Sequence, residues 1–374
     1  MRNKILHVIG RMDRGGVETW LMHVLRHMDH REFEFQFLVQ TEEDSAYDAE
    51  IRSLGGQIHY GGNPRNAFQY AAQFKGVVRL NGPFLAVHSH VYFYSGWIMK
   101  QAWKLAIPVR VAHSHTARKR GTGLQRQLYE TLMRHWLSHY ATHRIAVSPQ
   151  AGQALFGGPF TVVPYGIDFA PFHKPSSQAD INELKRRYGI PAGRKVIGHV
   201  GRFVPEKNHE FIAQTFRELL NKGIDAHLLL VGSGPLLRVV QQEIDALGLS
   251  NRCAFAGLQP LVVPFLRAMD IVLLPSHWEG LGIVGLESQA AGVPLLASMG
   301  VPTDLDVIPE FVEHIPLSQG PASWASAIER RLKQQNLKRG DELKRLESSK
   351  FGLQSAMQLL FKIYTERPQH FAAL

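Results

Sequence analysis

Short apolar runs alternate along the chain with segments in which apolar residues recur every three to four positions. The runs are continuous and rich in β-branched residues, which is typical of parallel strands buried on both faces. In the first half, strands are expected at Ile5–Ile9, Phe35–Val39, Phe84–His88, Val109–His113 and Arg144–Val147, and helices at Val17–Met28, Phe68–Leu80 and Leu124–His139. This alternation predicts a doubly wound α/β domain.

The alternation begins again after residues 169–178, where two prolines and several small polar residues indicate a linker. Strands are expected at Val196–Val200, His227–Val231, Ala254–Ala256, Ile271–Leu274 and Pro294–Ala297, and helices at Phe211–Leu220, with Asn208 as N-cap, and at Ile283–Ala291. Two Rossmann-like domains are therefore predicted, over residues 1–168 and 169–352. Open sheets bind ligands beyond the carboxyl ends of their strands, so we expect the active site in a cleft between the two domains.

The size and composition of the chain fit two globular domains. It has 374 residues, of which 45% are hydrophobic. A single cysteine, Cys253, cannot form an internal disulfide, which fits a reducing, cytoplasmic location. The apolar run at the N-terminus is too short for a signal peptide, and no stretch approaches the roughly 18 apolar residues of a membrane span. We therefore expect neither export by a signal peptide nor insertion through a bilayer.

The formal net charge of +10 is concentrated in one stretch. Between Ile51 and Ile167 there are 13 lysines and arginines, eight histidines and a single acid, Glu130, whereas the rest of the chain is close to neutral. This asymmetry indicates a partner with negative charge, such as anionic lipid headgroups, pyrophosphate groups or nucleic acid. No RNA- or DNA-binding motif is present, so we expect no nucleic-acid partner.

The most informative motif follows the expected strand Ile271–Leu274. Residues 276–282 read Ser-His-Trp-Glu-Gly-Leu-Gly and lead into a helix, with Glu279 in the turn and Glu287 two helical turns later. The free N–H groups at a helix start suit a phosphate, and the two carboxylates can accept hydrogen bonds from sugar hydroxyls. The spacing alone is equally compatible with two surface acids on a helix.

Together these residues carry a resemblance. Seven residues separate Glu279 from Glu287, and the preceding strand ends in Pro275-Ser276. This resembles the paired-glutamate motif of the family 4 (group 1) retaining glycosyltransferases of GT-B fold. Other segments extend the resemblance over nearly the whole chain: Gly15-Gly16, His113-Ser114-His115-Thr116, residues 163–168, Gly201-Arg202, Lys207-Asn208 and residues 231–235.

The resemblance implies a fold and a reaction. The fold would be GT-B, with two Rossmann-like domains whose parallel sheets face each other across a central cleft, and with a final helix in residues 353–374 that packs on the first domain. The reaction would be transfer of a sugar from a nucleotide-sugar donor, a substrate rather than a cofactor. The donor would carry UDP or GDP, and the acceptor would be a glycan or lipid-pyrophosphate-linked. Glu279 would then face the donor sugar, Glu287 would hold the ribose hydroxyls, and Gly280, Leu281 and Gly282 would line the donor site.

Two cations, Arg202 and Lys207, lie between an expected strand and a helix. A pyrophosphate leaving group gains negative charge as the glycosidic bond breaks, so fixed cations at this strand end would stabilise the transition state more than the ground state. Arginine gives forked contacts, and lysine acts as a point charge. The alternative is a pair of solvated cations beside a loop. The resemblance places both residues on the phosphates.

Several small residues follow other strands. Gly15-Gly16 opens the first helix, where absent side chains allow a ligand phosphate or sugar to approach the backbone. A tight strand-to-helix turn explains these glycines equally well. By resemblance, a second group borders the nucleotide of the donor: Gly201, Gly232, Gly234, Phe255 and Gly257. The absence of a GxGxxG motif argues against a nicotinamide cofactor.

Histidine pairs end two strands of the first half, His88 with His90 and His113 with His115. A pair of this spacing can bind a metal, but no third ligand is apparent from the sequence. By resemblance, His115 contacts the donor sugar, and we interpret His88 and His90 as structural residues or as residues that support the ligand-contacting ones. The Asp-x-Asp of residues 304–306 lies in a proline-rich stretch that we interpret as a surface loop, so no metal requirement is expected.

A basic segment follows these histidines. The cationic run at residues 118–120 is expected to form a mobile loop before the helix Leu124–His139, which carries arginines and histidines beside Leu128, Leu132 and Trp136. A basic amphipathic helix indicates peripheral contact with an anionic membrane, here its inner face. A solvated helix that packs through its apolar side is the alternative.

Two other function classes remain open on sequence grounds. A nucleotide-sugar epimerase would use the same fold without an acceptor, and a non-catalytic protein could bind polyanions or membranes through the basic first half. The sequence also departs from the family pattern, because Gly282 occupies a position where proline is frequent, and Gly285 and Ser288 flank Glu287 in place of commoner residues. These departures concern the identity of the donor more than the reaction.

Overall fold

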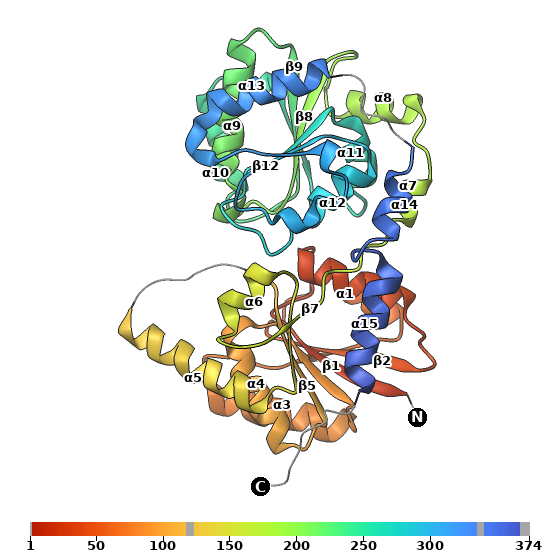
Figure 1. The fold of residues 1–374 in the computed structure, drawn as a ribbon, viewed down its shortest axis with the longest axis vertical. Coiled ribbons are helices and arrows are strands. Elements are labelled where there is room, and N and C mark those ends of the chain that lie inside the picture. The colour runs from red at the N-terminus through yellow and green to blue at the C-terminus, as the bar shows by residue number, and fades with distance from the viewer. Residues whose placement is uncertain (1, 117–122, 335–339, 367–374) are drawn as a thin grey trace. The chain divides into compact units, whose positions relative to one another are not determined.

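The computed structural model describes residues 2–116, 123–334 and 340–366, and the chain divides into two compact units (Figure 1). The first unit comprises Met1–Ile167 and Lys350–Leu374, and the second comprises Asp168–Ser349. The sequence suggested that the second domain spans residues 169–352. In the structure it begins one residue earlier and ends three residues earlier. Among the described residues, no helix combines the length and the apolar character needed to span a membrane.

The first unit is built on a seven-stranded parallel sheet of order β3-β2-β1-β4-β5-β6-β7. Its strands are β1 (Asn3–Val8), β2 (Phe33–Val39), β3 (Gln57–Tyr60), β4 (Ala86–Ser89), β5 (Val109–Ser114), β6 (His143–Ala146) and β7 (Thr161–Val162). Strands β2, β4 and β5 are buried along their whole length, because helices cover both faces of the sheet. The strand order reverses between β1 and β4, which is the topological switch point of a doubly wound sheet.

The described part of this unit contains the α-helices α1 (Gly16–His27), α2 (Asp48–Ser53), α3 (Ala67–Asn81), α4 (Ser95–Lys104), α5 (Leu124–Tyr140), α6 (Pro149–Leu155) and α15 (Leu353–Thr365). The last helix, α15, returns from the C-terminal part of the chain and packs beside α1 (Figure 1). Its Phe361 stacks on Phe33 with ring centroids 4.4 Å apart, and its Tyr364 is fully buried. The stacked ring of Phe361 and the buried ring of Tyr364 explain why this distant segment belongs to the first unit.

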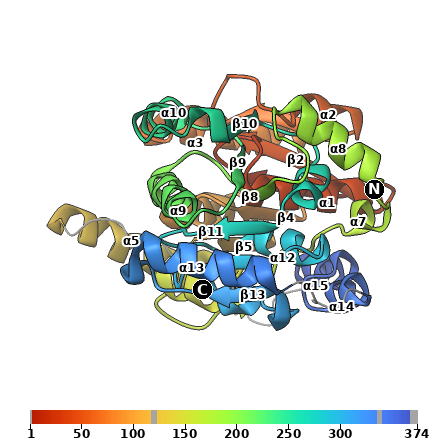
Figure 2. The ribbon, with the colours of Figure 1, turned by 90° about the horizontal axis from the view of Figure 1, so that it is seen from above.

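The second unit has a six-stranded parallel sheet of order β10-β9-β8-β11-β12-β13, and Figure 2 shows β9, β8 and β11 in sequence. The strands are β8 (Lys195–Val200), β9 (Ala226–Val231), β10 (Cys253–Gly257), β11 (Ile271–Leu274), β12 (Leu295–Ala297) and β13 (Val312–His314). The helices are α7 (Ala170–His173), α8 (Gln178–Arg187), α9 (His209–Asn221), α10 (Leu237–Ala246), α11 (Val263–Ala268), α12 (Ile283–Ala290), α13 (Gly320–Lys333) and α14 (Glu342–Glu347). A core that includes Ile197, Phe216, Leu228 and Trp324 joins the sheet to α9 and α13.

The predicted strands and helices are present with shifts of one or two residues at most ends, and the structure adds elements that the apolar pattern did not show. Strands β3, β7 and β13 are short edge strands whose residues are partly exposed, so they lack the continuous apolar run of a buried strand. The expected linker contains the short helix α7, in which Pro171 occupies the first turn.

Asn208 is the N-cap residue of α9, as predicted, but its backbone is left-handed (φ 56°) and its side chain caps no helix N–H; instead Nδ2 donates to the Pro275 carbonyl at 3.2 Å. One local expectation was wrong. The Asp-x-Asp stretch is not a simple surface loop, because Leu305 is fully buried in a 3₁₀ turn and Asp306 accepts from His314 Nε2 at 3.1 Å. This hydrogen bond raises the pKa of His314.

Candidate active site

In the second unit, the residues suggested by the sequence gather at one edge of the sheet. Four loops follow the carboxyl ends of the adjacent strands β10, β9, β8 and β11. These strand ends and the segments that follow them carry all the suggested residues of this unit: Phe255 and Gly257 at the end of β10, Gly232 and Gly234 after β9, Gly201, Arg202 and Lys207 after β8, Glu279, Gly280, Leu281 and Gly282 after β11, and Glu287 on the helix α12 that comes next. Because the strands are parallel, these loops lie at the edge where ligands of such sheets bind.

Backbone hydrogen bonds stack the first three loops on one another. Gly201 N donates to Val231 O at 2.9 Å, Phe203 N donates to Ser233 O at 2.9 Å, and Gly232 N donates to Gly257 O at 2.8 Å. The approach is so close that a Cβ added to Gly232 would lie 2.0 Å from Gly201 O, and Gly232 also has a positive φ of 137°. Only glycine permits this packing, which brings bare backbone to the strand ends.

Lys207 and Glu279 form an ion pair that joins the β8 loop to the β11 loop. Lys207 Nζ lies 2.5 Å from Glu279 Oε1, and Ser276 Oγ donates to the same oxygen at 2.6 Å. The side chains are 19% and 11% exposed, so the pair is largely shielded from water. Among the described residues, none donates a hydrogen bond to Glu279 Oε2, and this oxygen remains able to accept from a ligand hydroxyl.

The turn that holds Glu279 is anchored from both sides. Its N–H donates to Gly300 O at 2.9 Å, the preceding His277 N donates to Glu206 O at 2.9 Å, and Ser298 Oγ donates to Ser276 O. A Cβ at Gly300 would lie 2.3 Å from His277 O, so the segment after β12 packs tightly under the turn. Neither Ser298 nor Gly300 stands out in the sequence, because their role depends on a contact between distant segments.

Arg202 lies in the same loop as Lys207, directly after Gly201, and its side chain is exposed. Lys207 occupies the end of a 3₁₀ turn, Pro205–Lys207, where its N–H donates to Val204 O at 3.1 Å. The loop therefore presents one exposed guanidinium and one shielded ammonium. An exposed guanidinium can form forked hydrogen bonds with a phosphate without losing an internal partner.

Two buried histidines that the sequence did not single out lie beside Lys207. His199 on β8 bonds Leu273 O through Nδ1 at 2.8 Å, and His209 stacks on Phe203 with ring centroids 4.1 Å apart. Burial, with a smaller contribution from the Lys207 charge, lowers the pKa of His199 to about 4, and burial with the charges of His199 and Lys207 lowers that of His209 to about 2. Both rings are therefore neutral, so the two histidines place no positive charge beside the Lys207 ammonium.

Glu287 lies on α12, the helix that follows the Glu279 turn. The helix begins after Gly282, whose backbone is left-handed with a φ of 84°. A proline, with φ fixed near −65°, could not adopt this conformation, so this turn requires the glycine that the sequence has here. Burial raises the pKa of Glu287 to about 7. A carboxyl with such a pKa gains from hydrogen-bond donors that stabilise its charged form, and ribose hydroxyls are such donors.

In the first unit, Gly15-Gly16 and His115 also lie after the carboxyl ends of strands. Gly15 is the N-cap of the 12-residue helix α1, and Gly16 is exposed at its first turn. His115 follows β5, and both its ring nitrogens are engaged: Nδ1 with Tyr165 Oη at 2.7 Å and Nε2 with His90 Nδ1 at 2.8 Å. To contact a sugar hydroxyl, His115 must exchange one of these two bonds.

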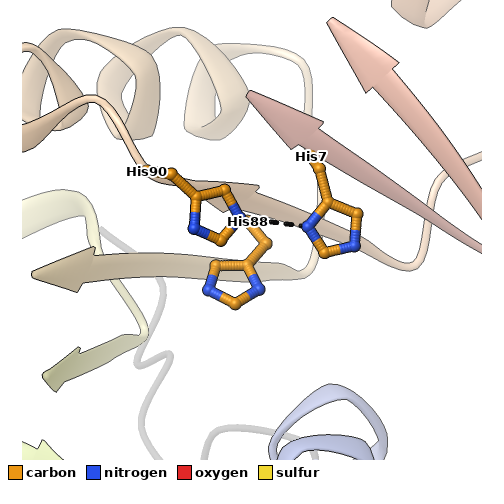
Figure 3. A group of neighbouring side chains, drawn as sticks. All are labelled: His7, His88 and His90. Atoms are coloured by element: carbon orange, nitrogen blue, oxygen red, sulfur yellow. Dashed lines mark hydrogen bonds between the residues drawn. The ribbon is translucent and has the colours of Figure 1, made fainter. Parts of the chain in front are cut away.

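The absence of a third ligand near His113 and His115 was a wrong expectation. His90 lies with both of them in a group whose ring nitrogens are all within 4.8 Å of one another, and His7, His88 and His90 form a second such group (Figure 3). His88 and His90 were expected to be structural or supporting residues. His90 bonds both His7 and His115, so it supports the histidine that is expected to contact the sugar. The cationic run at residues 118–120 lies outside the described residues.

Comparison with known proteins defines the class of this enzyme. The model of the glycosyl transferase 4-like domain matches residues 15–166, and that of glycosyl transferases group 1 matches residues 180–346. The Bacillus subtilis (strain 168) protein EpsF, named as a glycosyltransferase, is 35% identical over 338 residues, which are 88% of each chain. The chain therefore belongs to the group 1 glycosyltransferases, and the prediction of a transferase is confirmed.

Solved structures show the same fold. HepE of Anabaena, crystallised with UDP and glucose, has a TM-score of 0.78 and 19% identity, with 96% of this chain and 99% of HepE covered. WaaG, a glycosyltransferase involved in lipopolysaccharide biosynthesis, has a TM-score of 0.71 and 15% identity, with 96% of this chain and 99% of WaaG covered. The two parallel-sheet units are thus those of a GT-B glycosyltransferase, and the predicted fold class is confirmed.

Proposed function

We propose that the chain transfers a sugar from a nucleoside diphosphate sugar to a glycan or lipid-linked acceptor, with retention at the anomeric carbon. The observation that carries this proposal is the carboxyl edge of the second sheet, where the Lys207–Glu279 pair, Arg202 and Glu287 follow adjacent strands. A nucleotide-sugar site needs cations that bind the diphosphate, a carboxylate that binds the sugar and a carboxyl that binds the ribose, and this edge offers all three.

Each loop at this edge has a part in the proposal. The bare backbone of the stacked glycine loops borders the base, and Glu287 accepts the ribose hydroxyls. Arg202 and Lys207 bind the diphosphate, while Glu279, held through Oε1, offers Oε2 to the sugar. Backbone contacts would read the base, and UDP is favoured over GDP because HepE was crystallised with UDP.

In the proposed step, the bond between the anomeric carbon and the diphosphate oxygen breaks, and the acceptor hydroxyl attacks from the same face of the sugar. The leaving diphosphate takes up the proton of that hydroxyl, so no dedicated base is needed. Negative charge grows on the diphosphate as the bond breaks, and Arg202 and Lys207 stabilise it. Two fixed cations at the phosphates are the reason to propose that the reaction proceeds without a metal ion.

A panel of nucleotide-sugars tests the donor class. UDP-, GDP- and dTDP-linked sugars are added one at a time, and the thermal midpoint of the protein is followed. A donor at 100 times its Kd should stabilise the fold by about 2.7 kcal/mol, whereas free sugars should have no effect. Incubation of the stabilising donor without acceptor then separates a transferase from an epimerase, because the epimerase needs no acceptor to turn the donor over. No stabilisation by any donor would contradict the proposal.

The relatives suggest where the product is used. WaaG is involved in lipopolysaccharide biosynthesis, and we propose an analogous place for this chain in the assembly of a surface polysaccharide on an acceptor at the inner face of the membrane. Helix α5 supports this location. It packs through Met133 and Leu137, whereas Leu124, Leu128 and Leu132, one helical turn apart, are 72%, 63% and 45% exposed.

A charge on this exposed leucine row should weaken membrane contact. We expect Leu128→Glu to reduce binding to vesicles of anionic phospholipid by at least about fivefold, because it removes apolar insertion and adds repulsion from the headgroups. Co-sedimentation with vesicles gives the measurement. Leu80→Glu is the matched control, since Leu80 is 86% exposed on α3 of the same unit and lies outside the row. Equal binding by both variants and the wild type would refute the membrane contact.

A further inference from the structure

Five histidines gather on one face of the first sheet because of strand register. His7 on β1 lies opposite His88 on β4, and β4 pairs with β5 so that His88 lies opposite Val111. Side chains two residues apart along a strand point to the same face, so His90, His113 and His115 join His7 and His88 there. Figure 3 shows His7, His88 and His90 from two neighbouring strands brought together in this way.

The imidazoles are linked to one another rather than to acids. His7 Nδ1 lies 3.1 Å from His90 Nε2, His90 Nδ1 lies 2.8 Å from His115 Nε2, and His88 Nε2 lies 3.1 Å from His113 Nδ1. Each pair shares one proton, so one nitrogen of every pair presents a lone pair toward the other ring. Burial keeps the pKa of each ring well below its usual value.

Ring nitrogens of His90, His113 and His115 lie close enough together to hold one ion. In a tetrahedral site with Zn–N bonds of about 2.0–2.1 Å, two ligand nitrogens lie about 3.3 Å apart. His90 Nδ1 and His115 Nε2, 2.8 Å apart, need to separate by only a few tenths of an ångström to admit the ion, and a ring nitrogen of His113 lies within 4.8 Å of the other two. His113 adds an independent observation, since its ring is fully buried and its Nε2 has no hydrogen-bond partner.

A hydrogen bond from a tyrosine orients the His115 ring. His115 Nδ1 bonds Tyr165 Oη at 2.7 Å, which leaves His115 Nε2 directed toward His90. Metal-binding histidines usually have their second nitrogen fixed by such a partner, which sets the ring orientation. Trp20 packs against the rings of His90, His113 and His115 and limits their movement.

We propose that His90, His113 and His115 form a three-imidazole site for a divalent cation of the Zn²⁺ class, with the fourth position open to water. This group is favoured over His7, His88 and His90 because His7 and His88 are fully buried, whereas His90 and His115 are partly exposed at the carboxyl ends of their strands. A three-histidine set with one open position is a known arrangement for zinc.

The site has a consequence that rests on the proposed function. His115 is the residue expected to contact the donor sugar, and a bound cation would hold its Nε2 and bring a charge to that position. Zn²⁺ should therefore inhibit transfer, and the reaction itself needs no ion at these residues. Binding of the ion is measured on the resting protein, so failure of the transferase proposal leaves this measurement unaffected.

The experiment uses the full chain purified without a histidine tag. Equilibrium dialysis against buffered Zn²⁺ measures stoichiometry and Kd, and X-ray absorption of the Zn-loaded wild type counts imidazole ligands without any variant. We expect one ion per chain, with three imidazole ligands. His115→Gln and His113→Gln should each raise the Kd at least about tenfold. His59→Gln, on β3, should leave the Kd unchanged, and His7→Gln, which removes the hydrogen-bond partner of His90 Nε2 but no proposed ligand, should raise it less than His115→Gln does.

Other outcomes would overturn the proposal. If His7→Gln abolishes binding and His115→Gln does not, the ion occupies the deeper triad instead. If all four variants bind as the wild type does, or X-ray absorption finds fewer than three imidazoles, binding is adventitious. Thermal midpoints show whether each variant is folded, and the ligand count on the wild type stands even if a variant is not.

Discussion

Replacement of Lys207 by alanine should lower kcat by more than about 100-fold. Lys207 is the shielded cation of the proposed diphosphate site, and removal of one preorganised group that stabilises developing charge costs about 10²–10³ in rate. The same change removes the ionic partner of Glu279 at 2.5 Å, so the carboxylate that faces the sugar would lose its fixed position. Both effects act in the same direction. Steady-state kinetics with the donor found in the nucleotide-sugar panel gives the measurement.

Lys222→Ala is the matched control for this variant. Lys222 lies at the end of α9 in the same unit, and its ammonium is 3.8 Å from Glu329. Exposed pairs of this kind contribute little, so its loss should change neither kcat nor the thermal midpoint appreciably. A cooperative thermal transition of Lys207→Ala with a midpoint near that of the wild type would show that the variant is folded. A kcat within about threefold of the wild type would refute the role assigned to Lys207.

Replacement of Glu287 by glutamine should weaken binding of nucleoside diphosphate by about 10- to 100-fold while it stabilises the empty protein. The carboxylate accepts the ribose hydroxyls in the proposed complex, and hydrogen bonds to a charged group contribute about 1.5–3 kcal/mol. In the wild type, the pKa of about 7 means that the carboxyl must lose its proton to bind. Nucleotide affinity of the wild type should therefore fall as the pH drops below about 7, and that of the variant should not.

The stability effect of Glu287→Gln has a definite sign. The pKa is raised from 4.5 to about 7, so between these values the folded chain holds a proton that the unfolded chain releases. This carboxyl therefore costs stability increasingly as the pH rises from 4.5 to 7, and the cost stays constant above 7. Denaturant unfolding at pH 8 should show a gain of about 1–3 kcal/mol for Glu287→Gln and almost none at pH 4.5. Glu183→Gln, an exposed acid on α8, should show neither effect.

The fold could be predicted because its main signals are local. Continuous apolar strands such as Ile271–Leu274 and amphipathic helices such as α9 show their character within one segment. The edge strands β3 and β13 could not be predicted in this way, since their residues are only partly buried and they form by pairing with a distant neighbour. The left-handed backbone of Asn208 likewise depends on a bond to Pro275 across the unit.

For the candidate site, only the positions of its residues after the ends of particular strands could be predicted from the sequence. The sequence placed Arg202, Lys207 and Glu279 after their strands, and the parallel order of β8 and β11 brought their loops together. The direct Lys207–Glu279 bond, the shared Ser276 and the Ser298 support required side-chain geometry that no spacing reveals. The histidine cluster could be predicted in part. Histidine pairs at i, i+2 on successive strands indicate that each pair shares one face of the sheet, but the register that brings the pairs together is visible only in the folded sheet.

The most direct test of the proposed donor site is the part of the binding free energy that the β-phosphate contributes. UDP and UMP, or GDP and GMP if the donor panel selects guanosine, are titrated calorimetrically into the wild type and into the double variant Arg202→Ala, Lys207→Ala. The wild type should bind the diphosphate at least about tenfold more tightly than the monophosphate, and the double variant should bind the two alike. If the double variant keeps the full preference for the diphosphate, Arg202 and Lys207 do not hold the phosphates, and the proposed site is wrong.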